Sequence, residues 1–196
     1  MSAVPKQKLT EEEYLAIEEA AEFKSDFLNG EMFPVYRDGP EGMAGASRPH
    51  NYVKDNLIGE LFTRLKGGPC RTLSSDQRVR VNRTRLYTYP DIVIICGEPE
   101  YERSTLLNPR VIIEVLSDST NLYDRETKFR HYQLLPSVLE YVLVSQNAPV
   151  VERFVRQDDE SWNLRTFTGL TESFSLTSVP VEIPLADVFR GVFEQD

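Results

Sequence analysis

Apolar residues recur with a helical period in three places along the chain. Residues Thr10–Ala21 open with a capping-box pattern, because Thr10 and Glu13 stand three positions apart ahead of apolar side chains. A second helix is predicted over about Pro49–Lys66, where apolar residues repeat every three or four positions. A third helix is predicted over about Leu122–Leu135, before a proline.

Extended patterns lie between and after these helices. Within Phe23–Phe33, Asn29-Gly30 is flanked by apolar residues, which predicts a β-hairpin because both residues tolerate positive φ. Two later segments, Asp91–Cys96 and Arg110–Leu116, are nearly continuous apolar, β-branched runs, as expected of strands covered on both faces. The predicted strands are Cys70–Val81, Asp91–Cys96, Arg110–Leu116, Glu140–Ser145, Val150–Arg156 and Trp162–Phe167. This order of elements predicts a mixed α/β sheet within a single domain over residues 1–196.

The composition is that of a globular protein, with 40% hydrophobic and 27% charged residues. No apolar run has the length needed to span a bilayer, and the N-terminus lacks the pattern of a secretory signal. The two cysteines, Cys70 and Cys96, are far apart. Their spacing indicates neither a disulfide framework nor a zinc site, so we expect a reducing, cytoplasmic location.

The net charge of −9 argues against nucleic-acid binding, which depends largely on neutralising phosphates. The argument is only partial, because a nuclease site is itself rich in carboxylates. Arg78, Arg80, Arg83 and Arg85 form a local basic stripe that could contact nucleic acid. The same stripe could equally be a charged strand edge that prevents aggregation.

Two carboxylates stand out because they belong to the apolar strands. Asp91 opens the run DIVIIC, and Glu114 lies inside RVIIEVL. An unpaired buried charge is costly, so Glu114 requires a cation nearby. If the two strands are neighbours, the carboxylates can lie side by side and bind Mg²⁺, which prefers oxygen ligands. Alternatively, each carboxylate caps a loop or pairs with an arginine.

The sequence resembles a known group of proteins at these positions. Pro90-Asp91, followed by Glu114 on the next strand, resembles the PD-(D/E)xK nuclease superfamily. More closely, the chain is similar to the Uma-type family of putative restriction endonucleases over about residues 10–195. The segments that carry this resemblance are Gly30-Glu31-Met32 with His50, Tyr89-Pro90-Asp91, Asn108–Thr120, Tyr123–Tyr132 and Pro136–Val144.

The resemblance implies a restriction-endonuclease-like α/β fold. Its core would be helix, three strands, helix and strand, with an N-terminal helix–hairpin and added C-terminal strands. The resemblance also implies that Asp91 and Glu114 hold a divalent metal. We expect Mg²⁺, with Mn²⁺ as a substitute, and the carbonyl of Val115 as a further ligand.

One position departs from the superfamily pattern. The superfamily places a lysine two residues after the glutamate, where this chain has Leu116. The family pattern implies that the lysine has moved onto the following helix, at Lys128. Alternatively, Lys128 forms an ion pair with Asp124, four residues earlier, on a solvated helix face.

Two further side chains are candidate catalytic residues. His50 opens the second helix and can change its charge near neutral pH, and the resemblance also places a histidine there. A histidine at a helix start is otherwise more often a surface residue. Glu31 follows the Asn-Gly turn and could add a carboxylate, or it could be a solvated hairpin residue.

These features predict a Mg²⁺-dependent endonuclease that hydrolyses phosphodiester bonds of nucleic acid, with DNA as the expected substrate. A cut in both strands would favour a homodimer, and no membrane association is expected. The alternative is a degenerate nuclease fold that acts as a binding or regulatory module, which Leu116 and the net charge favour. The predicted catalytic residues are Asp91, Glu114, Lys128, His50 and Glu31.

Overall fold

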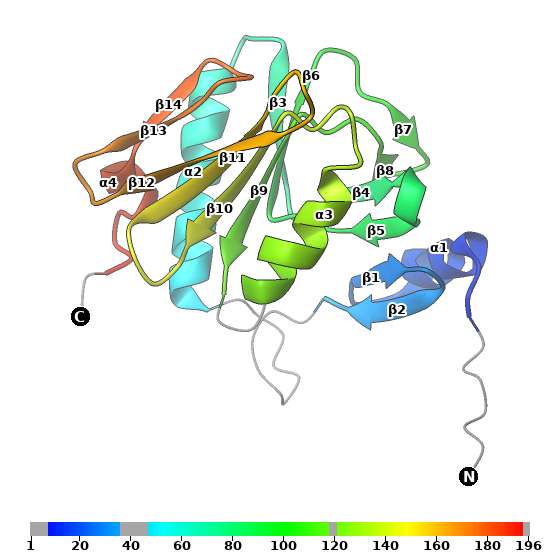
Figure 1. The fold of residues 1–196 in the computed structure, drawn as a ribbon. Helices are drawn as coiled ribbons and strands as arrows, with labels where there is room; N and C mark the ends of the chain where they lie inside the picture. Colours follow the sequence, from blue (N-terminus) through cyan, green and yellow to red (C-terminus); the bar gives the residue numbers. More distant parts are fainter. Residues whose placement is uncertain (1–7, 36–46, 118–120, 194–196) are drawn as a thin grey trace.

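A six-stranded sheet forms the centre of the protein (Figure 1). The computed structural model describes residues 8–35, 47–117 and 121–193. The strand order is β12-β11-β10-β9-β6-β3; β9 and β10 run parallel, and the other neighbours are antiparallel. These strands are β3 (Cys70–Ser74), β6 (Ile92–Cys96), β9 (Val111–Leu116), β10 (Glu140–Ser145), β11 (Val150–Arg156) and β12 (Trp162–Thr168).

Both faces of this sheet are covered. On one face lie α2 (Arg48–Leu65), α4 (Leu185–Val188) and the hairpin of β13 (Ser173–Leu176) and β14 (Val181–Pro184). On the other face, a π-helical turn, η2 (Tyr123–Lys128), continues into α3 (Phe129–Tyr132). This double cover explains the unbroken apolar runs of β6 and β9 and confirms that prediction. Among the described residues, no helix has the length and apolar content to cross a membrane.

The third helix differs from the prediction of one α-helix over Leu122–Leu135. It consists of the π turn η2 followed by one α-helical turn, and it ends at Tyr132. Within the π turn, Asp124 and Lys128 are both buried. Apolar periodicity cannot reveal such a turn, because the side chains that it directs inward are polar.

A second six-stranded sheet, in the order β2-β1-β5-β4-β8-β7, carries the N-terminal hairpin. The hairpin prediction is confirmed, with φ of 51° at Asn29 and 93° at Gly30. The predicted strand Cys70–Val81 is wrong as a unit, because a turn after Ser74 sends its second half into this other sheet. The strands are β1 (Ser25–Leu28), β2 (Glu31–Pro34), β4 (Arg78–Val81), β5 (Leu86–Thr88), β7 (Tyr101–Glu102) and β8 (Thr105–Leu106).

The first helix, α1 (Glu11–Ala20), packs on the second sheet. Thr10 is its N-cap, and the reciprocal hydrogen bonds between Thr10 and Glu13 confirm the capping box. The buried ring of Tyr14 stacks on Phe27 with ring centroids 4.7 Å apart. These contacts hold α1 against β1, which pairs with β5, the strand that precedes β6 along the chain.

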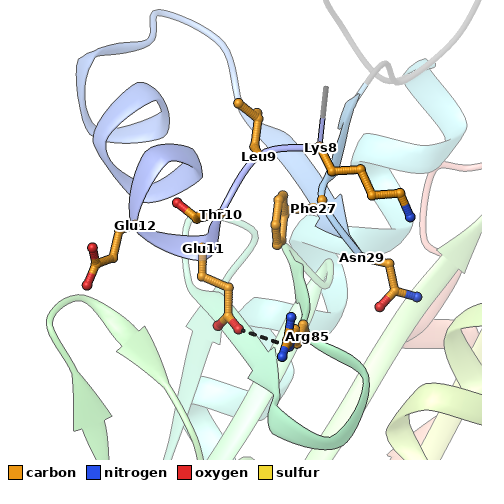
Figure 2. Close-up of a pocket in the computed structure, with 9 residues that line it drawn as sticks. Lys8, Leu9, Thr10, Glu11, Glu12, Phe27, Asn29 and Arg85 are labelled. Atoms are coloured by element: carbon orange, nitrogen blue, oxygen red, sulfur yellow. Dashed lines mark ion pairs between the residues drawn. The ribbon is translucent and has the colours of Figure 1, made fainter. Parts of the chain in front are cut away.

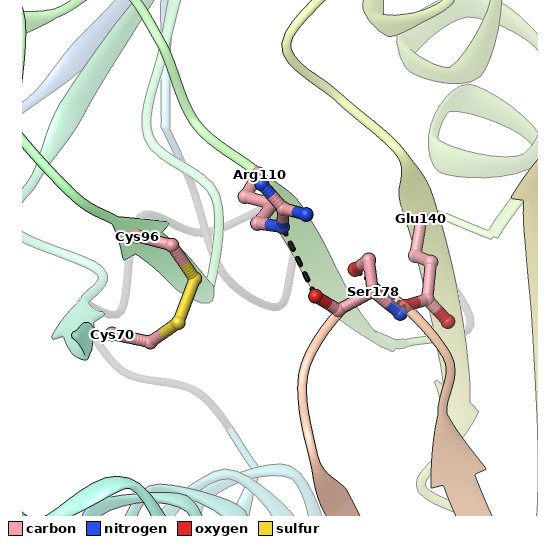
Figure 3. The surroundings of a disulfide bond; sticks show 5 residues. All are labelled: Cys70, Cys96, Arg110, Glu140 and Ser178. Carbon is pink, nitrogen blue, oxygen red and sulfur yellow. Dashed lines mark hydrogen bonds between the residues drawn. A yellow bond between two sulfur atoms is a disulfide. The ribbon is translucent and has the colours of Figure 1, made fainter. Parts of the chain in front are cut away.

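The two cysteines form a disulfide, which corrects the expectation drawn from their spacing (Figure 3). Cys70 in β3 and Cys96 in β6 are directly opposed in the antiparallel register, with their Cα atoms 4.0 Å apart. Their separation of 26 residues conceals this proximity, because spacing alone does not reveal which strands pair. The bond joins the edge strand of the central sheet to its neighbour.

Candidate active site

Asp91 and Glu114 lie side by side where β6 meets β9. Ile92 pairs with Ile113 in the antiparallel register, so Asp91, one residue earlier, stands across from Glu114. The backbone N–H of Asp91 donates to Oε2 of Glu114 at 3.1 Å. Both residues are buried, with 3% and 2% exposure respectively. The structure therefore brings together the two carboxylates that the apolar strands contain.

His50 reaches the same place from the first turn of α2. Ser47 caps this helix, and its hydroxyl accepts the backbone N–H of His50 at 3.3 Å. Nε2 of His50 lies 3.3 Å from Oδ1 of Asp91, while Oδ2 of Asp91 accepts the N–H of Val115 at 2.8 Å. His50 is buried, so it is a neighbour of the carboxylates and not a surface residue.

Lys128 reaches Glu114 from η2. Its Nζ lies 3.1 Å from Oε1 of Glu114 and 2.9 Å from Oδ1 of Asp124. The Tyr132 hydroxyl donates to the same oxygen of Glu114 at 3.2 Å. The pair with Asp124 exists but is buried, not solvated. Leu116, in the position where the superfamily has lysine, packs in the hydrophobic core.

Burial determines the charge state of this cluster. Removal from water raises the pKa of Glu114; the Lys128 ammonium opposes that rise, and the carboxylates of Asp124 and Asp91 add to it. Burial alone would lower the pKa of Lys128, but Glu114 and Asp124 hold it well above its usual range. Burial raises the pKa of Tyr132. Lys128 is therefore a fixed cation, and Tyr132 keeps the proton that it donates to Glu114.

Aromatic side chains support the π turn that carries Lys128. The hydroxyl of Tyr141, in β10, donates to the backbone carbonyl of Asp124 at 2.9 Å. The Tyr141 ring stacks on Phe129, which follows the turn, with centroids 5.1 Å apart. π-helical turns are rare and occur frequently at functional sites. Here the turn carries the carboxyl group of Asp124 and the ammonium of Lys128 to the sheet.

Glu31, among the predicted site residues, is not part of this group. It is exposed at the start of β2, opposite Leu28, and none of the contacts of the cluster involves it. The same hairpin instead supplies Asp26, which is buried and whose carboxylate helps to hold the pKa of Lys128 above its usual range. Sequence reasoning missed Asp26, although an acidic residue within a short core-facing strand was a usable signal.

The arginine stripe does not form a free basic surface. Arg78 is buried and hydrogen-bonded to two side chains. Arg80 pairs with Glu11 at 2.6 Å, and Arg85 pairs with the same carboxylate at 3.6 Å. Arg83 is exposed. Arg78 and Arg80 therefore bind the protein's own side chains, whereas Arg83 and Arg85 are the exposed members of the stripe.

A cavity of about 540 Å³ lies between the start of α1 and the N-terminal hairpin (Figure 2). Its wall carries charges of both signs, and the ion pair of Arg85 with Glu11 forms part of it. None of the clustered carboxylates, nor Lys128 or His50, lines this cavity. It is therefore separate from the candidate active site.

Comparison with known proteins identifies relatives over nearly the whole chain. Residues 11–186 match the Uma2 family, described as putative restriction endonuclease. Two uncharacterized proteins of Synechocystis sp. are similar: slr1290, 30% identical over 192 residues (97% of this chain, 96% of its own), and sll1609, 34% identical over 164 residues (82% and 88%). A crystal structure of a putative nuclease of DUF820 from Anabaena variabilis matches with a TM-score of 0.70 and 16% identity, covering 93% of this chain and 98% of that chain.

The structural match establishes the restriction-endonuclease-like fold and confirms the predicted class. The core order of helix, three strands, helix and strand corresponds to α2, β3, β6, β9, η2–α3 and β10. The family match supports a nuclease. The roles of individual residues rest on the geometry of the cluster.

Proposed function

The chain belongs to the Uma2 family, and we propose that it is a divalent-metal-dependent nuclease that hydrolyses phosphodiester bonds of DNA. The observation that carries the proposal is the buried pair of Asp91 and Glu114, approached by His50 from one helix and by Lys128 from another. An acidic pair with a fixed lysine beside it suits hydrolysis of a phosphodiester, whose charge increases as the bond breaks.

The cluster contains more acidic than basic groups. Asp91, Glu114 and Asp124 are buried together with the ammonium of Lys128, and the neighbouring Asp26 adds a fourth carboxyl group. Buried charge without compensation is costly, so this arrangement favours the binding of a cation. Carboxylate oxygens are hard donors, which favours Mg²⁺, and Mn²⁺ accepts the same ligands.

Asp91 and Glu114 would hold the metal, with the carbonyl of Val115 as a further ligand. Within the described ranges, no three His, Cys, Asp or Glu side chains are grouped as a metal site. Mg²⁺ does not require such a group, because it usually keeps several waters and takes only one or two carboxylates. The residues therefore fit this metal better than one that needs a full set of protein ligands.

The bound metal would supply Lewis-acid chemistry and lower the pKa of a coordinated water. The protein's own groups complete the site. The Lys128 ammonium lies beside Glu114 and would stabilise negative charge on the phosphate. His50 presents Nε2 next to Asp91, where it can hold or accept a proton. Tyr132 fixes the orientation of Glu114.

Nucleic acid is a better candidate substrate than a small phosphorylated molecule, because the family that the chain matches is described as putative restriction endonuclease. The net charge of −9 and the engaged arginines imply that binding depends on local contacts near the site. A double-strand cut would need two such sites, and we propose a homodimer for that reason.

Cleavage of supercoiled plasmid DNA by the purified protein tests the proposal. Nicking or linearisation should require Mg²⁺ or Mn²⁺ and should cease with EDTA or with Asp91→Asn. Glu31→Gln is the matched control, because it removes an exposed carboxylate of the hairpin outside the cluster. Metal-independent cleavage, or full activity in Asp91→Asn, would refute the assigned site.

A second candidate function is binding without cleavage. It is favoured by the fact that each carboxylate oxygen of Asp91 and Glu114 already has a protein partner. Gel retardation on the same DNA separates the two functions. Retention of DNA with no cleavage under any divalent metal would support a binding or regulatory module.

A further inference from the structure

Tyr123 opens the π turn that carries Lys128, and its ring faces the ammonium of that lysine. Nζ of Lys128 lies 5.7 Å from the centroid of the Tyr123 ring. A cation within about 6 Å of the face of an aromatic ring is attracted by the quadrupole of the ring. The lysine therefore has an aromatic contact in addition to its two carboxylate partners.

The π turn explains why two residues five positions apart meet. An α-helix has about 3.6 residues per turn, so side chains at i and i+5 point to different sides of it. A π turn is wider and closes its hydrogen bonds across five residues, which brings such side chains to the same side. Tyr123 and Lys128 are the first and last residues of η2. An ordinary α-helical turn would still pair Asp124 with Lys128, at i and i+4, but would turn the ring away.

The surroundings of the ammonium make this contact important. Nζ lies 3.1 Å from Oε1 of Glu114 and 2.9 Å from Oδ1 of Asp124. Lys128 is only 9% exposed, whereas Tyr123 is half-buried. A cation–π contact is stronger when water does not compete for the cation. A neutral ring also attracts the ammonium without adding another negative charge to a cluster that already has an excess of acids.

We propose that Tyr123 is a positioning residue of the candidate active site, whose ring restrains the Lys128 ammonium beside Glu114. A lysine side chain is long and flexible, so each further contact reduces the number of places that the ammonium can occupy. Tyr123 acts through the lysine and not as a metal ligand. Its consequence for catalysis rests on the proposed function, whereas the ring contact does not.

Urea unfolding of metal-free protein tests the contact without any assay of activity. Midpoints are compared for the wild type, Tyr123→Leu, Lys128→Met and the double variant. Tyr123→Leu should lower the midpoint clearly less once methionine has replaced the ammonium, so the two shifts will not add. In the control cycle, Leu122→Ala replaces Tyr123→Leu, and the shifts should add because Leu122 is 74% exposed. Additive shifts in the Tyr123 cycle would overturn the proposal.

NMR tests the contact in the unmodified protein, so it does not depend on the folding of a variant. The ring current of Tyr123 should move the Cε protons of Lys128 upfield of those of an exposed lysine such as Lys66. Lys128→Met identifies the signal by its disappearance, and Tyr123→Phe should keep the shift. Lys128 protons at the position of an exposed lysine would overturn the proposal.

Cleavage kinetics test the positioning role. Tyr123→Leu should lower kcat by about 10-fold, the factor for losing one cation–π contact of a desolvated ammonium, with little change in KM. Tyr123→Phe keeps the ring and should recover most of this loss. In the Lys128→Met background, Tyr123→Leu should cost nothing further. Equal losses in Tyr123→Phe and Tyr123→Leu would show that the hydroxyl acts and not the ring, and would overturn the proposal. If the wild type does not cleave DNA with Mg²⁺, the proposed function fails, while unfolding and NMR still decide the contact.

Discussion

Two buried glutamates on neighbouring strands illustrate two uses of a buried acid. Glu140, at the start of β10, is fully buried and accepts the backbone N–H groups of Thr177 and Ser178 together with the Ser178 hydroxyl. Figure 3 shows Ser178 beside Glu140. Arg153 lies 3.7 Å from its carboxylate. Glu114, in β9, is equally buried but lies among other carboxylates. Only donors contact the first glutamate, whereas the second has both donors and the further acids Asp91 and Asp124 around it.

The difference shows that burial of an acid does not by itself indicate a functional site. Glu140 has a complete set of donors, and its bonds fasten the β13–β14 end of the chain to the central sheet. Glu114 has one ammonium, one hydroxyl and one backbone N–H, and it must share the ammonium with Asp124. Only the second arrangement favours an additional cation.

The largest expected effect is the loss of the structural acid. Glu140→Ala leaves two backbone N–H groups, a hydroxyl and a guanidinium without their acceptor, so stability should fall by about 4 kcal/mol. Urea unfolding measures this change. Glu182→Ala, which removes an exposed glutamate of β14, is the control and should stay within about 0.5 kcal/mol. A small effect of Glu140→Ala would remove the contrast between the two acids.

The disulfide gives the next largest effect and concerns stability alone. Cys70→Ser combined with Cys96→Ser opens a loop of 26 residues, which should lower stability by about 3 kcal/mol through the greater freedom of the unfolded chain. Both cysteines lie away from the acidic cluster in sequence and contact, so the Mg²⁺-induced shift should remain. Equal unfolding midpoints with and without reductant in the wild type would contradict this role.

The sequence allowed the core and most of the cluster to be predicted. Asp91 and Glu114 were recognisable because an acid in an apolar β-branched run is conspicuous, and the family resemblance led to Lys128 and His50. Asp26 was missed and Glu31 chosen in its place, because a turn pattern fixes the hairpin but not which of its acids points inward. The disulfide was missed for a related reason, since strand pairing is a long-range property.

The third expected effect concerns Lys128, which would take the role of the lysine that the superfamily carries at the position of Leu116. Lys128→Ala should lower plasmid cleavage by about 100-fold, the scale of one electrostatic stabiliser, while Mg²⁺ still raises the melting temperature. Arg130→Ala, an exposed cation two residues later, is the matched control and should leave cleavage unchanged. Unchanged cleavage in Lys128→Ala would restrict the lysine to a structural ion pair with Asp124. Asp124→Asn should give a smaller loss than Lys128→Ala, because Glu114 would still hold the ammonium.

The smallest effect has the opposite sign and sharpens the contrast most. Glu114→Gln keeps the shape of the side chain but removes a charge that burial disfavours, so metal-free stability should rise by about 1 kcal/mol, or about 2–4 °C in melting temperature.

The pKa of Glu114 is raised in the folded protein, so the folded state binds its proton more tightly than the unfolded state. The contribution of protonated Glu114 to the free energy of unfolding is therefore fully present at pH values below the ordinary glutamate pKa. It is lost as the pH rises toward the raised pKa of Glu114. In EDTA, melting temperatures from about pH 5 to about pH 8 should fall more steeply for the wild type than for Glu114→Gln. Mg²⁺ should flatten the wild-type profile, since it stabilises the charged form that burial penalises. A Glu114→Gln protein that is clearly less stable than the wild type without metal would place Glu114 with Glu140, as a structural acid.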